Sequence, residues 1–180
     1  MKTIVTENIE IARALLLKGE LVAVPTETVY GLGADACNEK AVAKIYKVKG
    51  RPSNHPLIVH ISSMNLLNSW VDNIPKYALR LAEAFWPGPL TLILPSAQPK
   101  IDYLTGGQKN IGLRVPSHPI ALSLLKEFES KGGLGIAAPS ANPSGYVSPV
   151  SSQHVYEGLN GRIPYIIEGG SCKIGLESTI

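Results

Sequence analysis

Segments typical of β-strands alternate with amphipathic helical segments along almost the whole chain of 180 residues. Apolar residues recur at helical spacing in 7–18, 39–49, 75–85, 117–130 and 151–158. Short apolar runs typical of strands occupy 21–25, 57–61, 90–94, 111–115, 134–138, 164–168 and 175–180. Segment 26–38 contains the helix-breaking Gly31 and Gly33 and is predicted to be a loop. This alternation predicts one α/β domain over residues 1–180, with an open and largely parallel or mixed sheet.

Three loops of this predicted fold stand out as places for a functional site. Ligands of open α/β sheets bind beside the loops that follow the carboxyl ends of strands. In this chain the prominent loops of that kind are 26–33, 49–56 and 139–148. We therefore expect the functional residues to be concentrated in these segments.

Positive charge is concentrated in one short stretch. The net charge is only +3, yet five positive residues fall within twelve positions without an intervening acid: Lys40, Lys44, Lys47, Lys49 and Arg51. A charge this local favours a compact anion or a limited length of nucleic-acid backbone as the partner. It excludes a protein that binds nucleic acid over its whole surface.

Cysteine usage and hydropathy indicate a cytoplasmic protein. Cys37 and Cys172 form no C-x-x-C pair and lie far apart, which is typical of free thiols in a reducing compartment. The first residues lack the apolar run of a secretory leader, and no stretch of about 18 apolar residues occurs. We expect no membrane segment.

The familiar catalytic and nucleotide-binding signatures are missing. Residues 31–36 open like the dinucleotide fingerprint G-x-G-x-x-G but lack its third glycine. The sequence contains no P-loop, no H-E-x-x-H, no zinc-spaced Cys/His cluster and no G-x-S-x-G. A nucleotide would have to bind by another device.

The loop 49–56 is a candidate phosphate site. Lys49 and Arg51 follow a lysine-rich helical face, and together they could place a point charge and a planar guanidinium on one phosphate chain. Pro52 and Pro56 stiffen the segment. The alternative is an ordinary solvated lysine face that ends in a proline turn.

The loop 139–148 is uncharged but rich in hydrogen-bonding groups. No formal charge occurs from Gly132 to Tyr156, and the loop holds Ser140, Asn142, Ser144 and Ser148. Hydroxyl and amide groups of this kind can bind phosphates or a ribose. The alternative is ordinary turn chemistry, which uses the same residue types.

Arg114 is the most informative residue outside the loops. It lies between Leu113 and Val115 in an apolar strand, where a long cation requires an anion. The candidates are Glu27, Asp35, Glu177 or a bound carboxylate. In the first loop, Thr26, Glu27 and Thr28 could hold a small zwitterion, or they could form a satisfied turn. The mid-strand His60 is more often a hydrogen-bonded core residue than a catalyst.

These segments together resemble the Sua5/YrdC/YciO family, the threonylcarbamoyl-AMP synthases. Seven motifs occur in the family's order: Pro25–Gly33, Lys49–Pro52, Pro56–Ile61, Trp86–Thr91, Leu113–Pro116, Ala138–Asn142 and Gly175–Thr179. The resemblance implies a twisted, open, mixed sheet flanked by helices, with a concave and positively charged cavity. It also implies that L-threonine, bicarbonate and ATP with Mg²⁺ yield threonylcarbamoyl-AMP and pyrophosphate. The product would serve threonylcarbamoylation of adenosine 37 in tRNA through partner proteins that take up the adenylate, and the chain could itself bind tRNA or double-stranded RNA.

The resemblance also assigns site residues. Lys49 and Arg51 are implied to be catalytic. The implied ATP contacts are Lys49, Arg51, His55, Asn110, Ser140, Asn142 and Ser148. The implied threonine contacts are Thr28, His60, Arg114, Ala138 through its backbone, and Ser178. His55 stands where the family usually has Asn, and Asn110 stands where Thr is common; no protein ligand for the metal is implied.

Two other functions share the fold. A non-catalytic module for tRNA or double-stranded RNA would use the basic 40–51 segment, but it would leave Arg114 and the uncharged loop without a role. A carbamoyltransferase of hydrogenase maturation would need further segments that the sequence lacks. The family continues beyond Gly-x-Glu-Ser-Thr to an arginine that contacts ATP and, in longer members, to a second domain. We therefore expect the chain to be truncated at its C-terminal edge, with an intact threonine pocket and a weakened ATP site.

Overall fold

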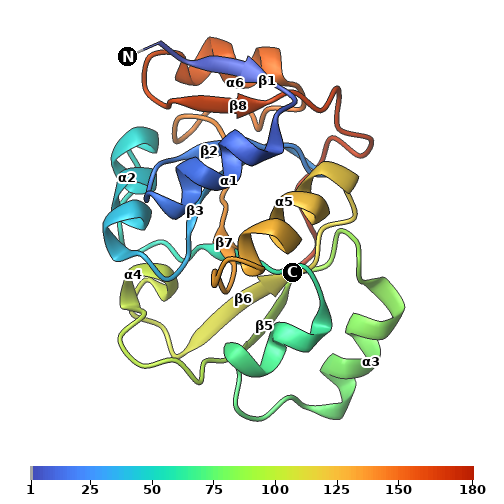
Figure 1. The fold of residues 1–180 in the computed structure, drawn as a ribbon. Helices are drawn as coiled ribbons and strands as arrows, with labels where there is room; N and C mark the ends of the chain where they lie inside the picture. The colour runs from blue at the N-terminus through green and yellow to red at the C-terminus, as the bar shows by residue number, and fades with distance from the viewer. Residues whose placement is uncertain (1) are drawn as a thin grey trace.

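A computed structural model describes residues 2–180 and shows one eight-stranded sheet flanked by helices (Figure 1). The strands are β1 (Ile4–Thr6), β2 (Val22–Val24), β3 (Gly31–Asp35), β4 (Ile58–His60), β5 (Leu92–Pro95), β6 (Asn110–Arg114), β7 (Ile136–Ala137) and β8 (Tyr165–Ile167). The helices are α1 (Ile9–Leu17), α2 (Glu39–Lys49), the 3₁₀ helix η1 (Met64–Ser69), α3 (Lys76–Phe85), α4 (Asp102–Thr105), α5 (Pro119–Glu129) and α6 (Ser152–Leu159). Within residues 2–180, no helix has both the length and the apolarity needed to cross a membrane.

The sheet is mixed, as predicted. Its strand order is β1-β8-β2-β3-β7-β4-β6-β5. The pairs β1–β8, β8–β2 and β4–β6 are parallel, whereas β2–β3, β3–β7, β7–β4 and β6–β5 are antiparallel. Strand β6 thus lies between β4 and the edge strand β5, and this half of the sheet holds both His60 and Arg114.

Two apolar cores cover the two faces of the sheet, because successive strand residues point to opposite sides. Val22 and Val24 belong to the core formed with α1 and α5. Ala23 points the other way, into the larger core that contains buried residues of α2, α3 and α6. Ile136 on β7 joins the α1 and α5 core, so the face that carries Ile136 also carries its cross-strand partner His60.

Helix α2 ends where the sequence predicts, and its end places two cations of the candidate site. The Asn38 side chain caps its start by accepting the Ala41 N–H, and Gly50 ends it with a φ of 64°. A left-handed residue at this position favours glycine. Lys49 is therefore the last helical residue, and Arg51 begins the loop.

The prediction of a loop over 26–38 is wrong in its second half. Residues 31–35 form β3, which pairs with β2 and β7. Gly33 serves close packing, because an added Cβ would lie 3.0 Å from Ile136 Cγ2 and 3.1 Å from the Val22 carbonyl oxygen. The glycines of this segment allow neighbouring strands to approach rather than breaking the structure.

The predicted strand over 175–180 is also wrong. This segment forms only an isolated bridge between Thr179 and Leu90. The Thr91 N–H donates to the Thr179 carbonyl, and the Thr179 N–H donates to the Pro89 carbonyl. The segment therefore lies beside the residues just before β5 but forms no strand of the sheet. The sequence patterns also gave no indication of β1, η1 or α4.

Candidate functional site

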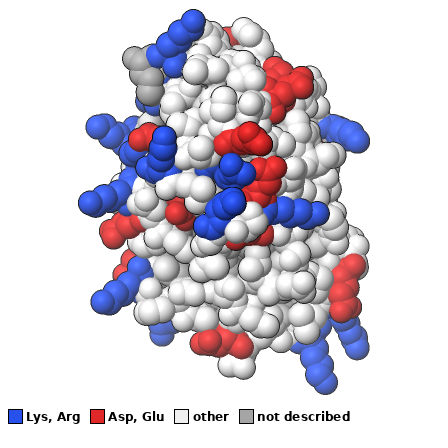
Figure 2. All heavy atoms as spheres, viewed as in Figure 1, with Lys and Arg blue, Asp and Glu red and all other residues white. Residues whose placement is uncertain are grey.

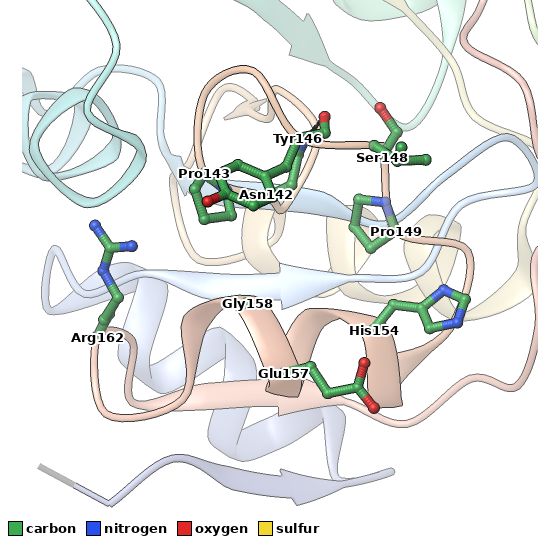
Figure 3. A pocket seen from close by; sticks show the side chains of 10 residues that line it. Asn142, Pro143, Tyr146, Ser148, Pro149, His154, Glu157, Gly158 and Arg162 are labelled. Carbon is green, nitrogen blue, oxygen red and sulfur yellow. Dashed lines mark hydrogen bonds between the residues drawn. The ribbon is translucent and has the colours of Figure 1, made fainter.

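Most of the predicted site residues line three hollows. The sheet hollow, of about 350 Å³, lies over β4, β6 and β5; its predicted residues are Arg51, Asn110, Ser140 and Ser178. The histidine cavity, of about 20 Å³, is lined by His60 and Ala138. The loop hollow, of about 700 Å³, is lined by Asn142 and Ser148 (Figure 3).

The sheet hollow and the histidine cavity are lined by nearby residues of the same two segments. On β4, Ile58 lines the sheet hollow and His60 lines the histidine cavity. On the segment after β7, Ser140 lines the sheet hollow and Ala138 lines the histidine cavity. The two hollows therefore follow one another along β4 and along the segment after β7.

Arg114 has a protein anion as its partner, and of the three acids proposed from the sequence it is Glu27. Arg114 Nη2 lies 2.6 Å from Glu27 Oε1, and both side chains are at most 7% exposed. Arg114 Nε donates to the Gly88 carbonyl, and Glu27 Oε2 accepts the Ser117 N–H at 3.0 Å. Among residues 2–180, Arg114 Nη1 has no acceptor, so the guanidinium is held in place with donors free for a ligand.

His60 is a buried, neutral imidazole with an unused atom. Its Nδ1 is buried without a hydrogen-bond partner among the described residues. The pKa of His60 is lowered to about 3, chiefly by burial and then by the positive charge of Arg114, its cross-strand partner. An unpaired polar atom in a buried site costs free energy, and a ligand that pairs with it removes this cost.

Hydroxyl groups surround the same end of the sheet. Thr28 is fully buried, and its Oγ1 lies 2.9 Å from Oγ1 of Thr26, which lines the histidine cavity. Ser178 Oγ lies 2.8 Å from Thr91 Oγ1. These hydroxyls can either donate or accept, so they can adapt to a ligand's amine, hydroxyl or carboxylate.

Lys49 is committed to the protein itself. Its Nζ donates to the Ser140 carbonyl, to the Asn142 carbonyl at 2.6 Å and to Asn142 Oδ1 at 3.1 Å. These three bonds account for the three N–H groups of an ammonium. The pKa of Lys49 is lowered to about 8, chiefly by burial and then by Arg51. In this arrangement Lys49 fixes the loop that carries Ser140 and Asn142, and its contact with phosphate stays a prediction.

The other predicted nucleotide contacts are more open. Arg51 is half-buried and donates from Nη2 to the Pro56 carbonyl at 3.2 Å. Asn110 is exposed at the start of β6. His55 is exposed as well, its backbone carbonyl accepts the Tyr46 hydroxyl, and it is not among the residues that line the sheet hollow. These side chains can rearrange around a large ligand.

The loop hollow contains residues that the sequence patterns did not single out. Figure 3 shows His154 and Glu157 of α6 and Arg162 facing the 142–149 loop across it. Ser148 Oγ donates to Glu177 Oε1 at 2.5 Å, and Glu177 lines the sheet hollow, so this bond links residues that line the two hollows. Helical spacing alone could have placed His154 and Glu157 on one face of α6.

The basic 40–51 segment does not form a continuous positive surface. Lys44 pairs with Glu20 at 2.9 Å, and Lys49 is buried. On the face shown in Figure 2, Lys and Arg side chains are interspersed with Asp and Glu. Over residues 2–180, no three His, Cys, Asp or Glu side chains are grouped to hold a metal ion. The predicted positive charge of the cavity stays a prediction.

The arrangement suits two ligands that react with each other. A carboxylate can bind the oriented guanidinium of Arg114, beside the neutral ring of His60. A larger anion can lie in the sheet hollow, where Arg51 and the Ser140 hydroxyl are available. Groups of this kind can position ligands and stabilise negative charge.

Comparison with known sequences gives a consistent match. The family model Sua5_yciO_yrdC, described as "Telomere recombination", matches residues 14–180. Threonylcarbamoyl-AMP synthase of Pyrococcus abyssi (strain GE5 / Orsay) is 49% identical over 173 residues, which are 96% of this chain and 50% of that protein. Threonylcarbamoyl-AMP synthase of Bacillus subtilis (strain 168) is 51% identical over 170 residues, which are 94% of this chain and 48% of that protein. The chain therefore spans about half the length of these curated relatives.

Comparison with solved structures agrees. The crystal structure of P. abyssi Sua5 complexed with L-threonine superposes with a TM-score of 0.92 at 47% sequence identity, covering 99% of this chain and 53% of that chain. These similarities confirm the predicted twisted, mixed α/β sheet and the resemblance drawn from the seven motifs.

Proposed function

This chain belongs to the Sua5/YciO/YrdC family, and we propose that it makes L-threonylcarbamoyl-AMP and pyrophosphate from L-threonine, bicarbonate and ATP. The single observation that carries the proposal is how the candidate groups follow one another along the sheet. His60 lines the histidine cavity and is the register partner of Arg114, and its neighbour on β4, Ile58, lines the larger hollow together with Arg51 and Ser140. The relatives named threonylcarbamoyl-AMP synthase, and the threonine-bound structure of one of them, support this proposal.

The residues at this end of the sheet suit L-threonine, and the histidine cavity of about 20 Å³ would have to widen to admit it. The threonine carboxylate would bind Arg114, whose orientation Glu27 and Gly88 fix. His60 Nδ1 can accept one hydrogen bond from the substrate's amine or hydroxyl group if Nε2 carries the ring proton. The Thr28 and Ser178 hydroxyls and the backbone at Ala138 would complete the site.

The reaction needs no covalent protein intermediate. The threonine amine attacks bicarbonate and forms a carbamate with loss of water. A carbamate oxygen then attacks the α-phosphorus of ATP, and the bond to the bridging oxygen breaks with release of pyrophosphate. The site contributes by holding the two substrates in line and by stabilising the charge that develops on the leaving group. This makes the chain a nucleotidyltransferase.

ATP would lie in the sheet hollow. Arg51 and Ser140 would contact its phosphates, while Lys49 and Asn142 hold the loop that presents Ser140. Ser148 lines the loop hollow and would reach the nucleotide only if its bond to Glu177 opened. Magnesium would enter with the nucleotide on its phosphate oxygens and neutralise charge on the departing pyrophosphate.

The product would serve tRNA modification. Threonylcarbamoyl-AMP is a mixed anhydride that an acceptor amine can attack, and the proposed acceptor is the amino group of adenosine 37. Partner proteins would take up the adenylate for this transfer. Binding of tRNA by the chain itself is a separate matter, and the paired Lys44 and buried Lys49 leave a smaller basic surface than the sequence suggested.

Pyrophosphate release tests the proposal directly. The protein is incubated with ATP, bicarbonate and L-threonine, and both pyrophosphate and the adenylate are measured. We expect pyrophosphate release to require threonine and bicarbonate together, with one adenylate formed per pyrophosphate. Release that is independent of threonine, or no release, would contradict the proposed function.

A further inference from the structure

A carboxylate lies among the anion-binding groups of the sheet hollow. Of the described residues that line this hollow, Glu177 carries the one acidic side chain, and it shares the lining with Arg51 and Ser140. The reaction proposed above gives this acid no role. A negative charge in a hollow that receives a polyphosphate is unfavourable, because like charges repel each other. An anion that enters the hollow therefore has to contend with Glu177.

The groups around Glu177 are those that a phosphate would use. Its Oε1 accepts the Ser148 hydroxyl at 2.5 Å. Burial and the charge of Arg51 lower the pKa of Lys49, whereas the negative charge of Glu177 raises it, so the carboxylate lies within the field of that ammonium. Hydroxyl donors and cations bind carboxylate oxygens and phosphate oxygens in the same way. The carboxylate of Glu177 thus has the surroundings of a bound phosphate.

The backbone on both sides of Glu177 is fixed, while its side chain can turn. Two residues before it, the Gly175 N–H donates to the Thr28 carbonyl at 3.0 Å, and two residues after it, the Thr179 N–H donates to the Pro89 carbonyl at 2.9 Å. The Glu177 side chain itself is exposed. Exposed side chains change rotamer within picoseconds to nanoseconds. The carboxylate can therefore leave its position without a movement of the chain.

We propose that the Glu177 carboxylate competes with phosphate groups for the Ser148 hydroxyl and for the positive field of Lys49 and Arg51. It accepts the hydroxyl when no phosphate is bound and turns toward solvent when a phosphate enters. The proposal rests on the use of ATP proposed above and adds a residue that limits how tightly the hollow holds phosphates. Glu177 thereby favours release of the product pyrophosphate, because the returning carboxylate takes over its contacts.

Removal of the negative charge is the first test. Glu177→Gln is measured by calorimetry against inorganic pyrophosphate and against ATP, with a chelator present so that no divalent cation screens the charges. We expect both ligands to bind about tenfold more tightly, because glutamine keeps an acceptor for Ser148 but loses the charge. The matched control is Glu157→Gln, the same change at an exposed acid that lines the loop hollow. This control should bind both ligands as the unmodified protein does.

The exchange of the Ser148 hydroxyl is the second test. Ser148→Ala alone should change the affinity for pyrophosphate less than about twofold, because in the unmodified protein the hydroxyl only exchanges one anion for another. Added to Glu177→Gln, the same change should weaken pyrophosphate binding about fivefold, because the hydroxyl no longer has a charged partner to give up. Effects of the two substitutions that simply add would contradict the competition for this hydroxyl.

Two further results would overturn the proposal. One is pyrophosphate binding in Glu177→Gln that is unchanged or weaker than in the unmodified protein. The other appears when the ATP titration is repeated with magnesium. If Glu177→Gln then binds ATP more weakly than the unmodified protein, the carboxylate is a ligand of the nucleotide's magnesium and not a competitor of its phosphates.

This proposal and the proposed function fail in distinguishable ways. If Glu177→Gln tightens pyrophosphate binding but the unmodified protein releases no pyrophosphate with threonine, the competition stands and the proposed function fails. If the unmodified protein releases pyrophosphate with threonine while Glu177→Gln binds pyrophosphate as before, the proposed function stands and the competition fails.

Discussion

The two ends of the candidate site differ in how far they belong to the folded interior. At the buried end, Glu27, Thr28, His60 and Arg114 are each at most 6% exposed. At the open end, Arg51 and Ser140 are half-buried, and Asn110 is exposed. Groups at the buried end should therefore be coupled to folding, whereas groups at the open end should affect ligand binding alone. Lys49 combines features of both ends, because its side chain is buried and it holds a loop of the open end in place.

The largest effect on stability should follow from removing the anion beside Arg114. Glu27→Ala leaves a buried guanidinium without its charge partner, which should lower the free energy of unfolding by about 3–5 kcal/mol. Urea unfolding measures this. The control is Glu127→Ala, which breaks the more exposed pair with Arg13 and should cost only about 0.2–1 kcal/mol. Similar losses in the two variants would remove the distinction between the ends of the site.

The next effect should appear in the pH dependence of stability. The pKa of His60 is about 3 in the folded chain and about 6.5 when unfolded, so between these values the unfolded state binds the extra proton. Stability from this group is complete above pH 6.5 and falls as the pH drops, by about 1.4 kcal/mol per unit. Between pH 7 and pH 5 the unmodified protein should lose about 2 kcal/mol more than His60→Asn.

The matched control for this comparison is His154→Asn, because His154 is exposed on α6. Its pH dependence should parallel that of the unmodified protein, since acids and other histidines contribute equally to both. If His60→Asn also parallels the unmodified protein, the imidazole of His60 does not titrate as a buried group.

A smaller effect is expected for the lysine that ties the loop. Lys49→Met removes donors from two carbonyl groups and one amide, but it also removes the cost of burying an ammonium whose pKa has fallen to about 8. We expect a net loss of about 1 kcal/mol and faster amide exchange in 139–148. Lys47→Met, on the exposed face of the same helix, should stay within about 0.5 kcal/mol and leave the exchange unchanged. Unchanged exchange in Lys49→Met would contradict its role in holding the loop.

The smallest effect on stability should accompany a large effect on activity. Arg51→Ala should change the free energy of unfolding by less than about 0.5 kcal/mol, because the side chain is half-buried and makes one hydrogen bond to a carbonyl. Its threonine-dependent pyrophosphate release should fall about a hundredfold or more. Turnover like that of the unmodified protein would remove Arg51 from the mechanism.

Sequence patterns predicted a residue's position or partner where neighbours along the chain determine it. The helical spacing of 39–49 was enough to place Lys49 at a helix end and Arg51 in the loop that follows. The apolar neighbours of Arg114 were enough to require an anion, and Glu27 was among the three acids considered. Residues 31–35 were misjudged, because the glycines there meet a packing demand from other strands, which spacing along the chain does not contain. The hydrogen-bond partners of Lys49 lie more than 90 positions away along the chain. The sequence pattern therefore predicted a positive charge at this position but not the hydrogen bonds of its buried ammonium group.

The position of β8 has a consequence for how the chain is made. β8 lies between β1 and β2, and Tyr165 is the register partner of both Ile4 and Val22. During synthesis at about 5–20 residues per second, the first strand must wait on the order of ten seconds for its neighbour to emerge. Until then Ile4 and Val5 are an unpaired apolar edge, the kind of segment that associates with other chains. The nascent polypeptide should therefore depend on chaperones until residues 165–167 have emerged and paired with β1.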